Sequence, residues 1–217
     1  MLARVIRTLC LALALGSVSG ALGCQGKGTG TIFEASERGD LERVEQLVAA
    51  DPSLLTARDR NGNSAAALAI LHGHNQVAIA LLEHGTPIDP ASEAEPSLLI
   101  ACVSRYSPES EAMLAYLLDH GADPNAFYAP EGWRPLHIAV NNGQLAKVRL
   151  LAAHGADLSA LDGHGQTPLA IAEHKLASAR DSSLRDPDEG GPDPDERRER
   201  VGAWLEMVAT LRELGAG

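Results

Sequence analysis

With 217 residues and 45% hydrophobic content, the chain is long enough to fold as one domain around a buried core. Aromatic residues make up only 3% of it, which favours a core of closely packed small helices over one built on large rings. Its net charge of −11 repels phosphate backbones, so we expect no nucleic-acid partner.

The N-terminal segment has the layout of a secretory signal. Two arginines, Arg4 and Arg7, precede an apolar run over 9–15 and then a stretch of small residues. The run is shorter than the roughly 20 residues that a membrane-spanning helix needs. We therefore expect residues 1–23 to be removed, which leaves 16 basic and 29 acidic residues and a net charge of −13.

The residues around this expected cleavage point indicate how the mature chain begins. The stretch Ala21-Leu22-Gly23-Cys24 resembles the lipobox of bacterial lipoprotein precursors, with Ala21 where that motif usually has leucine. The resemblance implies that Cys24 carries a lipid and that the protein faces the periplasm. The glycines of 25–30, with no strand before them, indicate that residues 24–30 form a flexible tether. Gln25 in place of aspartate favours the outer membrane. Plain secretory cleavage near Gly20 or Ala21 is the alternative.

The strongest pattern in the rest of the chain is an internal repeat of slightly more than thirty residues. Paired leucines lead into glycines at Gly85, Gly121 and Gly155, which follow one another at spacings of 36 and 34 residues, and a related ending reaches Gly215. Apolar residues within these segments recur at helical spacing. The pattern predicts short helices that bury their apolar sides only when successive units stack.

Two of the units share a second motif. Gly-Ala-Asp at 121–123 and 155–157 is followed by Arg134-Pro135-Leu136-His137-Ile138-Ala139 and Thr167-Pro168-Leu169-Ala170-Ile171-Ala172. These residues resemble the ankyrin repeat, whose signature is Thr-Pro-Leu-His-x-Ala before an outer helix ending in Leu-Leu-x-x-Gly-Ala-Asp. The resemblance covers nearly everything after residue 30. It implies an all-α solenoid of about five helix-turn-helix repeats with short β-turn fingers, over residues 31–217.

The signature residues have local physical reasons. Thr167 can accept free amide groups at a helix start, and Pro168 there loses only an N–H that would have no partner. Glycines after the outer helices can adopt the left-handed conformation that ends a helix. Small residues let neighbouring inner helices approach closely, namely Ala69, Ala101, Ala139 and Ala172.

Three parts of the repeat region depart from the pattern. The unit that begins at Pro96 has a lengthened turn around 106–109, and we expect it to be locally irregular. An acidic, proline- and glycine-rich stretch at about 178–197 predicts a disordered insertion, whose glycine placement does not suit a calcium loop. After it, an apolar stripe predicts a final outer helix, with Val201, Trp204, Leu205, Val208, Leu211 and Leu214 facing the core.

The eight histidines do not form a metal-binding or catalytic pattern. His84, His120 and His154 occupy equivalent positions in successive units, so roughly 10 Å should separate them, whereas zinc ligands lie about 2 Å from the ion. At the ends of outer helices they can bond free carbonyl groups instead. The resemblance implies that His137 ties adjacent turns together. We expect no catalytic residues, no cofactor and no metal, and a buried apolar role for Cys102.

In repeats of this kind, the fingers and inner helices form a concave surface that binds proteins. Phe127 and Tyr128 are adjacent aromatic residues that either anchor a partner or fold back onto the next finger, whereas Trp133 is expected mainly to pack. The residues that we predict to contact a partner are Arg60, Asn61, Phe127, Tyr128, Glu131, His164 and Gln166.

The sequence therefore favours a monomeric, non-catalytic scaffold that binds one protein partner and contacts the membrane only through an N-terminal lipid. The alternative is a periplasmic immunity or inhibitor lipoprotein that neutralises a toxin or hydrolase, because an acidic surface suits a cationic target.

Overall fold

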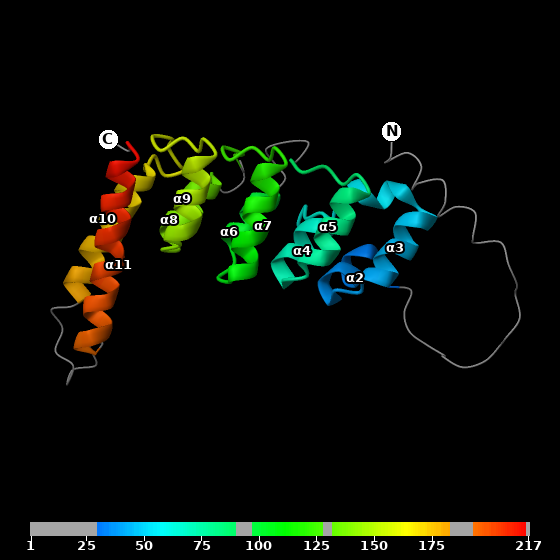
Figure 1. Ribbon diagram of the computed structural model, residues 1–217, viewed down its shortest axis with the longest axis horizontal. Helices are drawn as coiled ribbons and strands as arrows, with labels where there is room; N and C mark the ends of the chain where they lie inside the picture. The colour runs from blue at the N-terminus through cyan, green and yellow to red at the C-terminus, as the bar shows by residue number, and fades with distance from the viewer. Residues whose placement is uncertain (1–29, 90–96, 128–131, 183–192, 216–217) are drawn as a thin grey trace, which may run out of the picture.

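In the computed structural model, the described residues are 30–89, 97–127, 132–182 and 193–215. Within these ranges the helices form five pairs that stand side by side in a row (Figure 1), and extended pairing is limited to one isolated bridge between Arg58 and Ser64. The pairs are α2 (Ile32–Arg38) with α3 (Leu41–Ala50), α4 (Ala65–His72) with α5 (Asn75–Glu83), α6 (Leu98–Val103) with α7 (Pro108–Asp119), α8 (Pro135–Asn141) with α9 (Leu145–Ala153), and α10 (Pro168–Ser182) with α11 (Pro194–Glu213).

The first helix of each pair contacts the first helix of the next pair, so α2, α4, α6, α8 and α10 form an inner layer. The second helices form an outer layer, and the short 3-10 helix η1 (Pro52–Thr56) follows α3. This arrangement confirms the predicted all-α solenoid. None of the helices in the described ranges combines the length and apolar character needed to cross a bilayer.

The helix ends follow the local chemistry of the repeat. At four inner helices, a Ser or Thr side chain accepts the backbone N–H three residues later at 3.1 to 3.4 Å, from Thr31, Ser64, Ser97 and Thr167. At α8 the equivalent residue is Arg134, whose side chain makes no such bond. The glycine after each of four outer helices has φ between 87° and 105°, a left-handed conformation that glycine adopts without steric cost. The predicted roles of Thr167, Pro168 and these glycines are confirmed.

Small inner-helix residues allow the core to run continuously through the stack. Ala69, Ala139 and Ala172 are fully buried and Ala101 nearly so, at the contacts between successive inner helices. Cys102 is also fully buried, and burial raises the pKa of its thiol to about 12. This burial confirms the predicted role of Cys102 as a small buried side chain. A thiol with such a pKa stays protonated at neutral pH.

A buried lysine joins the third and fourth pairs, and the sequence did not predict it. Lys147 of α9 is only 1% exposed, and its ammonium group donates to the Cys102 carbonyl at 2.7 Å, the Ser110 hydroxyl at 2.8 Å and the Arg105 carbonyl. All three donors of the group therefore have acceptors. Burial lowers the pKa of Lys147, because the interior disfavours its charged form.

The third pair has the lengthened turn that the sequence predicts. Its inner helix ends at Val103 and its outer helix begins at Pro108, whereas two residues separate the helices of the first and second pairs. Tyr106 in this turn is 70% exposed and its hydroxyl donates to the Asn142 carbonyl, which links the turn to the next unit.

The predicted bounds of the acidic insertion, about 178–197, are wrong at both ends. Helix α10 continues to Ser182, and α11 already begins at Pro194. The Asp193 side chain accepts the Asp195 N–H at 2.8 Å, and proline takes the first helical position, so this start has an ordinary helix cap. The turns by which the two helices exceed the predicted bounds contain exposed charged residues. Residues 183–192, between these helices, lie outside the described residues.

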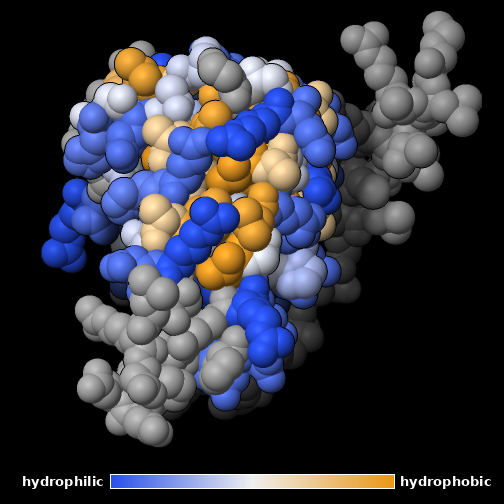
Figure 2. Space-filling view, turned by 90° about the vertical axis from the view of Figure 1, so that its left-hand side faces the viewer, coloured by the Kyte–Doolittle hydropathy of each residue, from blue (hydrophilic) through white to orange (hydrophobic). Residues whose placement is uncertain are grey.

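The predicted apolar stripe of the last helix is also partly wrong about which side chains are covered. Val208 and Leu211 are buried as predicted, but Leu205 and Leu214 are 44% and 42% exposed. Because α11 belongs to the last pair in the row, no further unit covers its outer side within the described residues. Figure 2 views this end and shows apolar side chains lying between hydrophilic ones.

Candidate protein-binding groove

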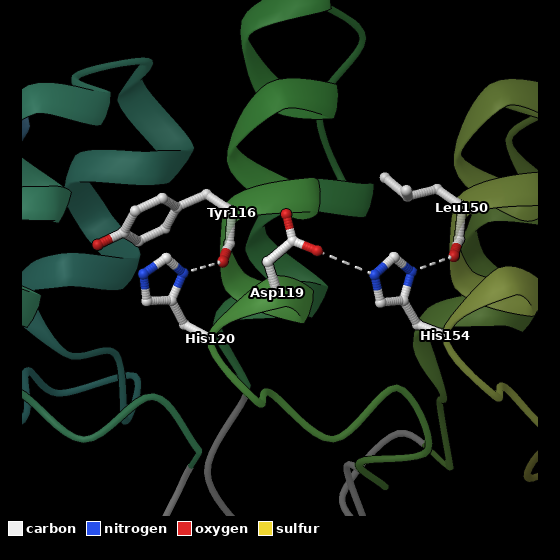
Figure 3. A network of polar contacts seen from close by, with 5 residues as sticks. All are labelled: Tyr116, Asp119, His120, Leu150 and His154. Atoms are coloured by element: carbon white, nitrogen blue, oxygen red, sulfur yellow. Dashed lines mark hydrogen bonds and ion pairs between the residues drawn. The ribbon is translucent and has the colours of Figure 1, made fainter.

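The histidines at the ends of the outer helices bond carbonyl groups of their own helices. The Nδ1–H of His84, His120 and His154 donates to the carbonyl oxygen four residues earlier, at 2.7, 2.7 and 2.9 Å. Figure 3 shows the Tyr116 ring stacked on His120, at 4.0 Å between ring centroids, and Asp119 facing His154 at 3.2 Å. The predicted role of these histidines as helix-end residues is confirmed. Within the described ranges, no three His, Cys, Asp or Glu side chains are grouped so that they could hold a metal ion.

The fingers are built on aspartates that organise their own loops. Oδ1 of Asp59 accepts the backbone N–H groups of Asn61 and Asn63, both at 2.8 Å. Oδ1 of Asp162 accepts those of His164 and Gln166 at 2.8 and 2.9 Å. The same two-and-four-residue pattern shapes both loops, because a carboxylate satisfies amide groups that a tight turn leaves free.

Two fingers touch through their backbones. The N–H of Gly163 donates to the Gly132 carbonyl at 2.7 Å. Gly132 has a φ of 65°, and a Cβ atom at this residue would lie 2.4 Å from the Gly163 Cα atom. Residue 132 therefore has no room for a side chain, and glycine is what allows the fingers at 132–134 and 162–166 to approach each other.

A groove of about 310 Å³ lies beside this contact, between the two fingers and the inner helices α8 and α10. Its size is at the lower end of the range for sites that bind organic ligands or side chains. Half-buried Trp133 and buried Ile171 contribute apolar surface. The lining residues are Gly132, Trp133, His137, Asn141, Asp162, Gly163, His164, Gln166, Ile171, His174 and Lys175.

His137 holds the floor of this groove to the neighbouring finger. It is buried, and its Nε2–H donates to the Ala160 carbonyl at 3.0 Å, which confirms the predicted tie between adjacent turns. Burial lowers the pKa of His137, although nearby carbonyl groups favour its charged form. In the neutral ring Nδ1 is an acceptor, and this buried atom has no hydrogen-bond partner.

Arg134 fixes the finger that precedes α8. Its guanidinium group donates to the Asn125 carbonyl at 2.7 Å, and its central carbon lies 5.1 Å from the centroid of the Phe127 ring. This is the distance of a cation–π contact. Phe127 is half-buried, so part of its ring is held within the protein and part stays accessible.

The predicted contact residues fall into three groups. His164 and Gln166 line the groove. Arg60 and Asn61 are exposed on the finger before α4, towards the other end of the row, and Phe127 lies under Arg134 without lining the groove. Tyr128, Glu131 and the predicted lipid-attachment residue Cys24 lie outside the described residues.

Sequence reasoning missed the inner-helix side of the groove. Asn141 and His174 occupy equivalent positions, seven residues into α8 and α10, and Lys175 follows His174. Counting the inner-helix register from Pro135 and Pro168 would have placed these residues on the same face as the fingers. Trp133, which was expected mainly to pack, both contacts the core and lines the groove.

Comparison with known families agrees with this architecture. A family profile described as ankyrin repeats in three copies matches residues 32–128, and a second, described as ankyrin repeats in many copies, matches 117–172. Together the two matches run from α2 into α10 without a gap and include both fingers of the groove.

Curated relatives match over parts of their lengths. The ankyrin repeat protein nuc-2 of Neurospora crassa is 33% identical over 138 residues, which are 62% of this chain and 12% of that protein. The B-cell lymphoma 3 protein homolog of Mus musculus is 35% identical over 123 residues, 56% of this chain and 26% of that protein. The ARF GTPase-activating protein Git of Drosophila melanogaster is 44% identical over 62 residues, 29% and 8% of the two chains. The chain thus spans about a quarter or less of these relatives.

Proposed function

The chain belongs to the ankyrin repeat family, and from this premise we propose that it is a non-catalytic scaffold that binds a partner protein across its fingers and inner helices. The observation that carries the proposal is the groove between the fingers at 132–134 and 162–166. It combines apolar surface from Trp133 and Ile171 with polar side chains from two fingers and two inner helices, which is the composition of a protein-recognition surface.

Site-specific crosslinking in the cells that produce the protein tests this proposal. A photoreactive amino acid replaces His164, which is exposed on the groove finger, and in a control replaces Ala112, which is exposed on the outer helix α7. We expect a discrete crosslinked partner from position 164 that position 112 does not give. Identical adducts from both positions, or none from position 164, would contradict binding at the groove.

We further propose that the scaffold is anchored in the outer membrane of a bacterial envelope through a lipid on Cys24 and faces the periplasm. The support is the sequence pattern of residues 1–24. Cys24→Ser should release the protein from the membrane fraction, whereas Cys102→Ala, which removes the buried thiol, should leave it there. Release of neither variant would contradict lipidation at Cys24, and mass spectrometry of the mature N-terminus identifies the cleavage site.

A second candidate function is inhibition of a toxin or hydrolase that reaches the periplasm, and the excess of 29 acidic over 18 basic residues favours it. An acidic protein accelerates its association with a cationic target at low salt. Binding to toxins encoded beside the gene should therefore weaken steeply as salt rises. If no association is detected even at low ionic strength, this function is excluded.

A further inference from the structure

The groove contains an ammonium group and two imidazole rings, in a chain whose net charge is negative. The chain carries a net −11, yet the groove presents the ammonium group of Lys175 and the imidazoles of His164 and His174. These side chains come from one finger and one inner helix, and they are half-buried or exposed, so a bound segment can reach them. They offer N–H donors to an acceptor in the groove.

Two acidic side chains near the groove bond to groups other than Lys175. Among the described residues, Asp162 is the one carboxylate that lines it, and its Oδ1 already accepts the N–H groups of His164 and Gln166. Glu173, next to His174 in α10, pairs instead with Arg212 of α11 at 2.6 Å. Lys175 shares the groove with the apolar surfaces of Trp133 and Ile171. Beside such surfaces, a charge-assisted hydrogen bond from Lys175 to an incoming carboxylate is stronger than in open solvent.

We infer that the groove recognises a short partner segment that inserts one Asp or Glu side chain against Lys175, with an apolar neighbour on Trp133. The inference rests on the proposed function and specifies its partner. The volume of about 310 Å³ admits one or two side chains rather than a folded domain. The net negative charge of the whole chain disfavours a segment with many carboxylates, so the residues flanking the inserted one should be neutral or basic.

The same net charge disfavours a nucleic acid as the source of the negative charge. A phosphate backbone carries one charge about every 1.7 Å along a duplex, so its many phosphates would be repelled by the net charge of −11 on the chain. A single carboxylate on a protein segment avoids this repulsion. The observations therefore favour a protein segment.

Selection from a library of displayed random twelve-residue peptides tests the inference on the purified protein. The wild type is compared with Lys175→Glu and with Arg38→Glu, which makes the same change of net charge at an exposed residue of α2, far from the groove. We expect peptides enriched in single Asp or Glu residues next to an apolar residue. Urea unfolding of each variant confirms that binding is compared between folded proteins.

Labelled peptides from the selection then give affinities. We expect Lys175→Glu to weaken binding at least about tenfold, Lys175→Gln to weaken it less, and Arg38→Glu to change it less than about twofold. Replacing the peptide carboxylate by its amide should weaken wild-type binding similarly, and should matter little to Lys175→Gln. If the peptide carboxylate affects the affinity only when Lys175 is present, the carboxylate and Lys175 contact each other.

Several outcomes would overturn the inference. One is an absence of enriched peptides, and another is an equal loss of affinity in Lys175→Glu and Arg38→Glu. The third is a duplex DNA probe that binds as tightly as the peptides. Neutral peptides that lose binding in Lys175→Glu would show that the groove binds a protein segment without a carboxylate. The crosslinking from position 164 tests the proposed function separately.

Discussion

Replacing Arg134 by threonine tests how helix α8 is held. This helix starts without a side-chain cap, whereas Thr31, Ser64, Ser97 and Thr167 cap the other inner helices. Three residues beyond Arg134, the buried Nδ1 atom of His137 has no partner. One hydroxyl at position 134 can correct both defects, because its oxygen accepts the backbone N–H of His137 and its hydrogen is donated to Nδ1.

The expected magnitude follows from the interactions that the substitution adds and removes. A helix cap contributes about 1 kcal/mol, and a hydrogen bond to an unpartnered buried acceptor about another 1 kcal/mol. Removing the arginine loses its bond to the Asn125 carbonyl, about 1 kcal/mol, and its cation–π interaction with Phe127, about 0.5–1 kcal/mol. Arg134→Thr should therefore have nearly the stability of the wild type. Arg134→Val, which has the same shape without the hydroxyl, should be about 2 kcal/mol less stable than Arg134→Thr.

Urea denaturation followed by far-UV circular dichroism measures this difference, because both variants lose the same arginine and should share one m value. The comparison between threonine and valine depends only on the hydroxyl. If the two variants unfold within about 0.5 kcal/mol of each other, the hydroxyl stabilises nothing, and the account of the missing cap and the unpartnered imidazole is refuted.

Three further predictions concern single contacts. Gly132→Ala should destabilise the protein more than Gly85→Ala in urea unfolding, since both residues have positive φ but only the first would place its Cβ atom against the backbone of the next finger. Cys102, whose thiol pKa burial raises to about 12, should react with iodoacetamide at pH 8 only as fast as the protein unfolds, and immediate modification in mass spectra would contradict its burial. The Leu150 carbonyl raises the pKa of His154 above 6.5, so this group stabilises the fold fully below pH 6.5 and less as the pH rises through the raised value. The urea midpoint should therefore fall between pH 6 and 8 by less in His154→Gln than in the wild type, and an equal fall would contradict the linkage.

The fold was predictable because each unit carries its own boundary residues. Thr167 and Pro168 start a helix by local chemistry alone, and glycines such as Gly121 end one, so the sequence pattern does not depend on distant contacts. The bounds of the acidic insertion were wrong for a related reason. Composition describes what a segment can bury, but Asp193 and Pro194 start a helix whose first turns bury little.

The parts of the candidate site that the sequence did not predict depend on contacts between units. Lys147 is buried because the carbonyl groups at the end of α6, a different repeat, lie within its reach. His174 and Lys175 belong to the groove because α10 stands beside α8 and its finger. No local pattern marks these residues, and their polarity alone predicts a solvated helix face.

The departure of Arg134 from the signature is itself evidence about function. Sequences that violate a local rule tend to do so at functional sites, where the position of a side chain matters for binding. Arg134 leaves α8 uncapped, but it holds Asn125 and Phe127 of the finger leading into the groove. Arg134→Thr should then keep the stability of the fold while loosening Phe127, and crosslinking from position 164 should decrease. If that variant crosslinks as efficiently as the wild type, Arg134 stabilises only the conformation of its own finger. In that case the binding surface does not extend to Phe127.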